Sequence, residues 1–339
     1  MLRYLIHRLA LMPLTLIGIT FLVFALSRFL PGGPLERQLW SEMKQSAFSA
    51  PAADIARLTD EQWSDLRSYY GLEKPMLPAY LHWLSRLAHF DLGTSLRYQE
   101  PVSELVAARF PISLIFAFSA LLFSYGVCVP IGLLLAYRPL ALSSRLISGA
   151  ILILAAVPSY VCATLLFLYP AARFGWFPLG GLMSEDFSSM NRPEQWLDIL
   201  SHAALPLFAY LIGHTAVMSY LMRNHLEEHL GSECMRMARA KGASHGQAVL
   251  RHAFPLSVLP LVSQFGSYLA LIVGGSFIIE RIFNIDGMGL LGYEALVERD
   301  YPLVLGLLTI VSVLHLVGNL VSDLCLALLD PRIRWDEAR

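Results

Sequence analysis

The stretch whose spacing most resembles a catalytic motif is His-Leu-Glu-Glu-His at 225–229. Two histidines four residues apart share one face of a helix, and with Glu228 they match H-x-x-E-H, a zinc-protease pattern. The chemistry would be metal-assisted peptide hydrolysis. No clear third ligand follows, and a solvated helix end with i,i+4 pairing explains the same residues. We keep a membrane metallopeptidase as an alternative function and predict no metal site.

A second group of residues consists of polar side chains inside or beside apolar segments. Ionisable residues within a membrane are functional candidates, because burying them there is costly. His214, Gln264 and Tyr268 are the candidates for lining a translocation path, and Gln264 and Tyr268 share a helix face. The alternative is a structural role as hydrogen bonds between helices. At the predicted outer end of the fifth apolar segment, the candidates for an outer gate are Glu280, Arg281 and Asp286.

The elements that must position these residues are membrane-spanning helices. The chain has 339 residues, of which 56% are hydrophobic and only 15% charged. A helix needs about 20 apolar residues to cross a bilayer. Six runs contain no Asp, Glu, Lys or Arg, and they are 9–27, 110–137, 146–172, 199–222, 253–279 and 302–322. We predict an all-α integral membrane protein with six transmembrane helices, the first of which is a retained signal anchor.

The distribution of Lys and Arg predicts the orientation. With the N-terminus inside, the inner segments carry twelve Lys and Arg residues and the two short outer loops carry four. This bias predicts that both termini and the stretch 235–254 are cytoplasmic. The long segment 31–109 then lies outside, where capping signals at Thr59 and Gln62, a stop at Gly71 and the stretch LPAYLHWLSRLAHF predict a small helical insertion. A net charge of −1 gives no indication of nucleic acid as a partner.

Between the fourth and fifth runs lies a basic stretch, MRMARAKGASHGQAVLRHAF, at 235–254. Gly242 is predicted to end one helix in a left-handed conformation, and Ser244 with Gln247 to cap the next. Pro255 then marks the entry to the fifth span. One interpretation is an anchor on anionic headgroups, and the other is a docking surface for a cytoplasmic partner. The docking candidates are Arg236, Ala238, Arg239, Ala240, Lys241, Gly242, Ala243 and Ser244.

This stretch resembles the EAA loop of permease subunits in binding-protein-dependent ABC importers. The loop's glycine falls on Gly242 and its closing proline on Pro255, but of EAA itself only the last alanine, at Ala238, is present. FDLGTSL and NLVSDLCLALLDPRI are similar to the B-type dipeptide and oligopeptide permeases. FPLGGLMSEDF and IIERIFNIDGMGLLGYEALVERDYP most resemble the Yej-type peptide and microcin C branch, although many B-type relatives have proline in place of Asp286.

The resemblance implies a type I ABC importer permease fold and a set of partners. These are a second, C-type permease subunit, two cytoplasmic ABC ATPase domains and a periplasmic solute-binding protein. It divides the chain into 1–30 (tail and first helix), 31–109 (periplasmic segment) and 110–339 (permease core, with the loop at 223–255). It also implies a peptide or peptide-like substrate, with a non-peptide solute such as a metal chelate as the alternative.

A separate observation on the sequence also indicates that ATP binds to a partner rather than to this chain. No G-x-x-x-x-G-K-[ST] motif is present, so the chain has no P-loop. We therefore expect no cofactor and no enzymatic activity on this chain, with ATP and Mg²⁺ held by the partner ATPases. A passive channel is a third class of function, but nothing in the spans resembles a selectivity filter.

Overall fold

The computed structural model describes residues 2–29, 75–137 and 140–329. Within them every regular element is a helix, and the single extended pairing is an isolated bridge between Thr94 and Pro101. The all-α prediction is therefore confirmed for the described residues. The predicted capping residues Thr59 and Gln62 and the stop at Gly71 lie outside them.

The described helices belong to two compact units. The first combines 1–8, 109–291 and 313–339, and the second combines 9–108 and 292–312, in each case as far as these ranges are described. Four of the described helices contribute residues to both units: the long helices α1 (Leu2–Phe29), α5 (Val102–Tyr137) and α14 (Tyr301–Leu329), and the shorter α13 (Met288–Val297). The units thus follow spatial packing rather than the order of segments along the chain.

Five helices in the described residues are long and apolar enough to cross a membrane. They are α1, α5, α8 (Arg192–Leu230), the continuous helix His245–Ala270 and α14. A bent helix pair brings the number to six when it is counted as one span. Each of the six apolar runs therefore corresponds to a candidate span, which confirms the prediction of a multi-pass membrane protein.

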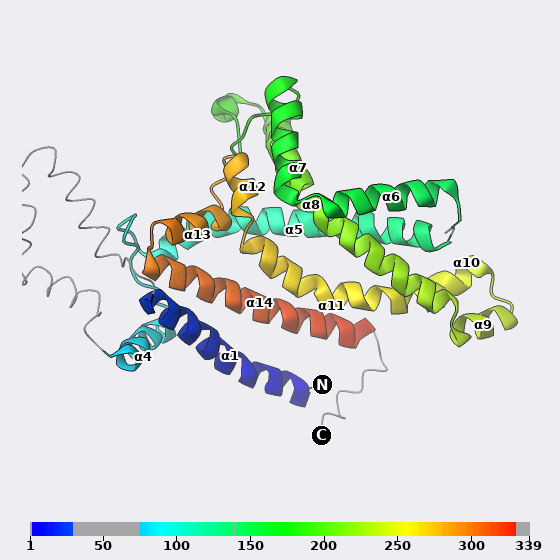
Figure 1. The fold of residues 1–339 in the computed structure, drawn as a ribbon, viewed down its shortest axis with the longest axis horizontal. Helices are drawn as coiled ribbons and strands as arrows, with labels where there is room; N and C mark the ends of the chain where they lie inside the picture. Colours follow the sequence, from blue (N-terminus) through cyan, green and yellow to red (C-terminus); the bar gives the residue numbers. More distant parts are fainter. Residues whose placement is uncertain (1, 30–74, 138–139, 330–339) are drawn as a thin grey trace, which may run out of the picture. The chain divides into compact units, whose positions relative to one another are not determined.

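The third apolar run is broken. α6 (Leu142–Ala156) meets the following helix, formed by α7 (Ser159–Leu166) and the π-helical η1 (Phe167–Arg173), at 97° (Figure 1). Val157 at the bend is extended, with ψ of 123°, because a proline disfavours helical conformation in the residue before it. The proline is Pro158. This run is a broken span or a re-entrant loop, rather than the uninterrupted helix predicted from its composition.

The fifth span differs from its predicted bounds at both ends. It begins within the basic stretch, because α10 (His245–Ala248), the π-helical η3 (Val249–Ala253) and α11 (Phe254–Val273) are continuous. The π turn ends at Ala253, two residues before Pro255, whose missing N–H prevents regular helical bonding. At the far end Gly275, with φ of +85°, ends the helix before α12 (Phe277–Ile282). The predicted entry at Pro255 and the predicted end at Ile279 are therefore wrong. The candidate span runs over His245–Ala270, and its helix ends at Val273.

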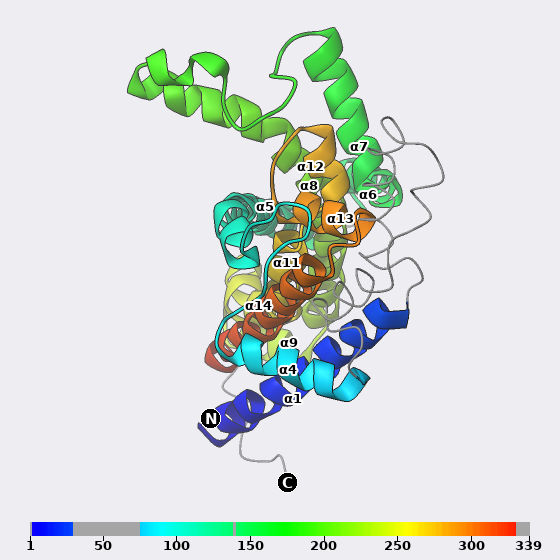
Figure 2. The ribbon, with the colours of Figure 1, turned by 90° about the vertical axis from the view of Figure 1, so that its left-hand side faces the viewer.

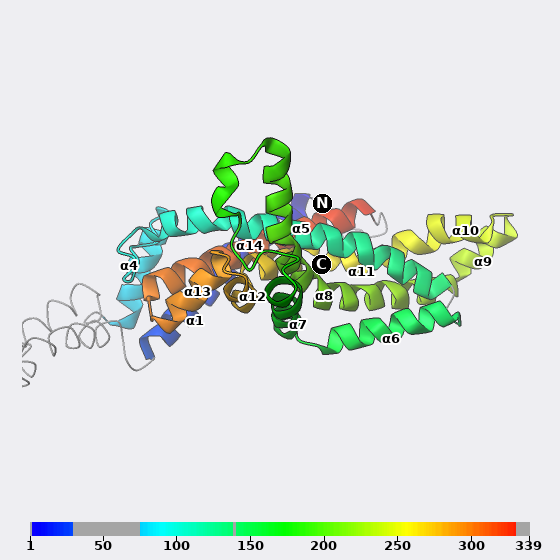
Figure 3. The ribbon, with the colours of Figure 1, turned by 90° about the horizontal axis from the view of Figure 1, so that it is seen from above.

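α8 organises the first unit. It begins with a capping box between Asn191 and Glu194, after the 3-10 helix η2 (Glu185–Ser189). Along its length it contributes buried residues to four apolar clusters, which it shares with α5, α6, α7, α11, α12 and the segment 235–253. Figure 3 shows α5, α8 and α11 running alongside one another. In Figure 2, α7 and the start of α8 extend away from α11.

α11 and α14 cross at a point of very close backbone approach. A Cβ on Gly266 would overlap the backbone of Gly318, so neither position has room for a side chain. The Gly266 N–H donates to Ser322 Oγ at 2.8 Å, and Ser267 Oγ donates to Asn319 Oδ1 at 2.9 Å. Small residues and interhelical hydrogen bonds are typical of contacts between membrane helices.

In the second unit, α4 (Met76–Ala88) packs on α1. The Tyr80 hydroxyl donates to the Ile17 carbonyl at 2.9 Å and lies 2.9 Å from Thr20 Oγ1. This helix coincides with the predicted LPAYLHWLSRLAHF segment, which is confirmed. Next to α14, the buried Asp300 carboxylate accepts hydrogen bonds from the Ser95 hydroxyl (2.5 Å) and the Leu96 N–H (2.9 Å).

Candidate functional sites

The basic stretch folds into the short helix α9 (Glu233–Ala240) and the first turns of the continuous helix 245–270, which are joined by a tight turn. We call residues 233–253 the basic elbow. α9 ends in a Schellman motif: the Ala243 N–H donates to the Ala238 carbonyl at 3.1 Å, and the Gly242 N–H donates to the Arg239 carbonyl at 3.0 Å. Gly242 has φ of +88°, a conformation that side chains disfavour. The predicted left-handed glycine is confirmed.

The second half of the basic elbow begins at the predicted cap. The Ser244 hydroxyl accepts the Gln247 N–H at 3.3 Å, and the Gln247 side chain accepts the Ser244 N–H at 3.2 Å. This reciprocal pair is a capping box, and the prediction is confirmed. Figures 1 and 3 both show α9 and α10 together at one end of α8 and α11.

One face of the basic elbow is packed against its own chain. Met235, Ala238 and Ala248 are buried in a cluster with Ala136 of α5 and Leu226 of α8. Ala238 is only 8% exposed. The structure therefore places this docking candidate inside the helix packing, where it fixes the elbow to the ends of α5 and α8. Ala243 is half-buried against the same cluster.

The other face of the elbow is exposed and combines charge with apolar surface. The exposed docking candidates are Arg236, Arg239, Ala240, Lys241, Gly242 and Ser244. Beside them, Met237 and Leu250 are each 60% exposed, although both are apolar. Leu250 lies within the candidate span His245–Ala270, whereas Met237 lies in α9 beside Arg236. An apolar side chain among cations, such as Met237, is suited to contact with another protein, because it gains by leaving water.

The three candidate path residues are only partly brought together. The rings of His214 and Tyr268 meet edge to face, with centroids 3.9 Å apart, and the ring centroids of Tyr125 and His214 are 6.4 Å apart. His214 Nε2 is buried and makes no hydrogen bond in the described part of the chain. Gln264 is exposed on α11.

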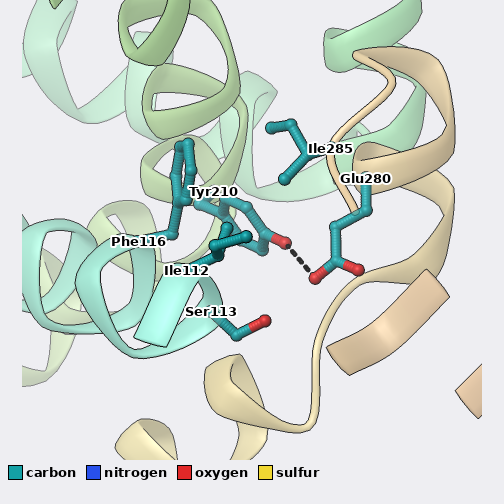
Figure 4. A pocket seen from close by; sticks show the side chains of 6 residues that line it. All are labelled: Ile112, Ser113, Phe116, Tyr210, Glu280 and Ile285. Atoms are coloured by element: carbon teal, nitrogen blue, oxygen red, sulfur yellow. Dashed lines mark hydrogen bonds between the residues drawn. The ribbon is translucent and has the colours of Figure 1, made fainter. Parts of the chain in front are cut away.

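Among the gate candidates, Glu280 lies in a buried polar cluster and is only 3% exposed. Figure 4 shows its carboxylate facing the hydroxyl of Tyr210, which donates to Glu280 Oε1 at 3.4 Å. The Leu290 N–H donates to Glu280 Oε2 at 2.6 Å, and the Met288 N–H donates to Ser113 Oγ at 2.8 Å. Glu280, Tyr210, Ser113 and the backbone of 288–290 form what we call the Glu280 cluster.

The Glu280 cluster provides hydrogen-bond acceptors for backbone N–H groups in the first turn of α13. The N–H groups that begin a helix have no partner within it, and a negative charge there is favoured by the helix dipole. Glu280 and Ser113 supply these partners from two other helices, α12 and α5. Glu280 lies after the 245–270 span and before α14, and its burial raises its pKa to about 7.

The other two gate candidates have different surroundings. Asp286 forms an ion pair with Arg109, in which Arg109 Nε lies 2.7 Å from Asp286 Oδ1. This pair joins the segment before α13 to α5. Arg281 is exposed and lies outside the Glu280 cluster. The sequence analysis did not identify Tyr210, Ser113 or Arg109. A polar residue within an apolar run was the available signal for Tyr210.

Comparison with known proteins shows the family to which the chain belongs. Residues 128–335 match the family described as "binding-protein-dependent transport system inner membrane component". The chain belongs to this family. The matched region contains the basic elbow, the His214 and Tyr268 pair, and the α8 and α12 parts of the Glu280 cluster.

Similar proteins from three bacteria align with this permease over almost its whole length. It is 33% identical to the peptidoglycan transport system permease protein YejB of Agrobacterium fabrum, covering 98% of each chain. It is 30% identical to the oligopeptide transport system permease protein AppB of Bacillus subtilis, covering 99% of this chain and 100% of the relative. It is 28% identical to the dipeptide transport system permease protein DppB of Escherichia coli K12, with 98% and 99% covered. The predicted resemblance to B-type peptide permeases is confirmed.

The H-x-x-E-H stretch lies at the end of α8 of this permease, just before the basic elbow. His225 Nδ1 is 3.6 Å from Glu228, and Glu227 pairs with Arg223 at 2.8 Å. In the described ranges, no three His, Cys, Asp or Glu side chains are grouped to hold a metal ion. These contacts are those of a helix end with paired charges, and they give the metallopeptidase alternative no third ligand.

Proposed function

We propose that this permease is the membrane subunit of an ATP-driven importer of peptides or peptide-like compounds, and that its basic elbow docks into a cytoplasmic ATPase. The observation that carries the proposal is the two-sided construction of the elbow. Its inner face is fixed to α5 and α8, while its outer face presents cations and exposed apolar side chains. A surface anchored in this way transmits a partner's movement to the spans.

The energy source is external in this proposal. The chain has no P-loop, so ATP and Mg²⁺ are bound by two partner ATPase domains, and this subunit carries no cofactor. A second, C-type permease completes the translocation path, and a periplasmic solute-binding protein delivers the substrate. The purified chain is expected to hydrolyse no ATP, whereas a complex co-expressed with its partners hydrolyses it. ATPase activity in the isolated chain contradicts the proposal.

The peptide substrate is supported by the names of the similar proteins, which refer to peptidoglycan, oligopeptide and dipeptide transport. The direct test is uptake in a deletion strain, using di- and oligopeptides and a peptide–nucleotide antibiotic. We expect peptide uptake or antibiotic sensitivity to fall on deletion and to return with the gene. Unchanged uptake and unchanged sensitivity would leave a non-peptide solute, such as a metal chelate, as the substrate.

The proposed location is the bacterial inner membrane with both termini in the cytoplasm. This orientation follows from the Lys and Arg bias and puts the basic elbow on the ATPase side. A reporter fused at Ser188, in η2, should be active in the periplasm, and one fused at Ser232, before α9, should be active in the cytoplasm. The opposite pattern would refute both the orientation and the docking proposal.

A further inference from the structure

The Glu280 cluster brings residues of three helices together around one segment of the chain. Glu280 is on α12, Tyr210 is on α8 and Ser113 is on α5. The segment 283–290 donates hydrogen bonds to Glu280 and Ser113, and Tyr210 donates to Glu280. Phe283, Ile285 and Met288 of this segment are at most 2% exposed. The segment is therefore held closed over a carboxyl group that has almost no access to water.

The groups that face Glu280 are neutral hydrogen-bond donors, one carboxylate and apolar side chains. α8 contributes the Tyr210 hydroxyl, and the 283–290 segment contributes the Leu290 N–H. The same segment contributes the Asp286 carboxylate, whose charge is partly balanced by Arg109 of α5. α7 packs on α12 through apolar side chains such as Leu166. No cation in the described residues pairs directly with Glu280.

We propose that the Glu280 cluster is a proton-sensitive closure, in which segment 283–290 is held shut when Glu280 is protonated and loosens when Glu280 ionises. The Tyr210 hydroxyl and the N–H groups that begin α13 favour the ionised carboxylate in part, but burial without a cationic partner outweighs them. The ionised form is therefore costly to keep buried. Opening the segment admits water to the carboxylate and removes that cost. The proton passes between Glu280 and the surrounding solution, so no other reactant is needed.

The direction and size of the effect follow from linkage. The closed state binds the proton more tightly, because burial raises the pKa of Glu280 from 4.5 to about 7. Closure is thus strongest below pH 4.5 and weakens as pH rises towards 7. Between pH 5.5 and 7.5, these two values give an increase of about 20-fold in the ratio of open to closed segment.

Hydrogen–deuterium exchange on the full-length chain in lipid nanodiscs tests this closure. After correction for intrinsic exchange rates, a peptide covering 284–291 should lose about 20-fold protection between pH 5.5 and 7.5. Glu280→Gln keeps the shape but does not titrate, so its protection should be the same at both pH values. A peptide covering α9 and α10 is the internal control. Constant protection in the wild type, or an equal loss in Glu280→Gln, overturns the proposal.

A second variant covers the case in which Glu280→Gln does not insert. Asp286→Asn removes a negative charge that raises the pKa of Glu280, so the midpoint of the protection change should move to lower pH. Tyr210→Phe, which removes a single donor, should keep a pH-dependent change. An unmoved midpoint in Asp286→Asn contradicts the mechanism. The periplasmic location of this segment rests on the proposed function. The exchange experiment needs no partner and no substrate, so its outcome is independent of whether the proposed function is right.

Discussion

Replacing Gly242 with valine tests whether the shape of the basic elbow, rather than its charge, couples it to a partner. Gly242 has φ of +88°, and no atom lies within 4 Å of the place where a Cβ would stand. Within the permease the substitution therefore causes backbone strain and no clash. A left-handed conformation costs a residue with a side chain roughly 1–2 kcal/mol, which lowers the population of the native turn about 5- to 30-fold.

The matched control is Gly242→Asn, because asparagine adopts the left-handed conformation with less strain. Both variants are compared with wild type for membrane abundance, ATPase co-purification and transport. We expect Gly242→Val to reduce transport at least 5-fold at normal abundance, with Gly242→Asn much less affected. An equal loss in both variants indicates that the partner touches position 242 itself. A valine variant that inserts normally, retains its ATPases and transports refutes coupling through the turn, and the elbow is then only a membrane anchor.

Three further substitutions separate packing, docking and charge. Ala238→Asp places a carboxylate in the buried elbow cluster and should lower the stability of the fold by on the order of 2–4 kcal/mol. Ala240→Asp is the control, because Ala240 is exposed and this variant should insert normally. Membrane abundance and thermal aggregation in detergent distinguish the two variants. Gly266→Val forces α11 away from Gly318 and should destabilise the permease by about 3 kcal/mol or more, measured in the same aggregation assay. Arg251→Gln removes an exposed charge and should change transport little, since such a charge near headgroups contributes about 1 kcal/mol.

The sequence predicted those features that depend on neighbouring residues. The capping box at Ser244 and the left-handed Gly242 are determined within one turn of helix, so their signals are local and both were found. The apolar runs likewise predicted the spans. The bend at Pro158 had a local signal as well, but a proline inside a long apolar run is also compatible with a kinked continuous helix, and composition does not distinguish the two.

The Glu280 cluster was only partly predictable for a different reason. Its side chains come from positions 113, 210 and 280, and nothing in the sequence states which helices become neighbours. The inward placement of Ala238 had no signal either, because alanine is compatible with either face of a short helix. The sequence thus identified Glu280 and the elbow residues, but not what each of them contacts.

The π turn before Pro255 determines how the basic elbow is rotated about the helix axis relative to α11. α10, η3 and α11 form one continuous helix, so the direction in which the elbow faces is fixed by the number of residues in η3. Each residue of an α-helix turns the chain by about 100°. Deleting the exposed Arg251 would remove no residue of the buried cluster, yet rotate the preceding part of the elbow by roughly a quarter turn relative to Gly266. Length in this short segment is therefore constrained independently of residue type.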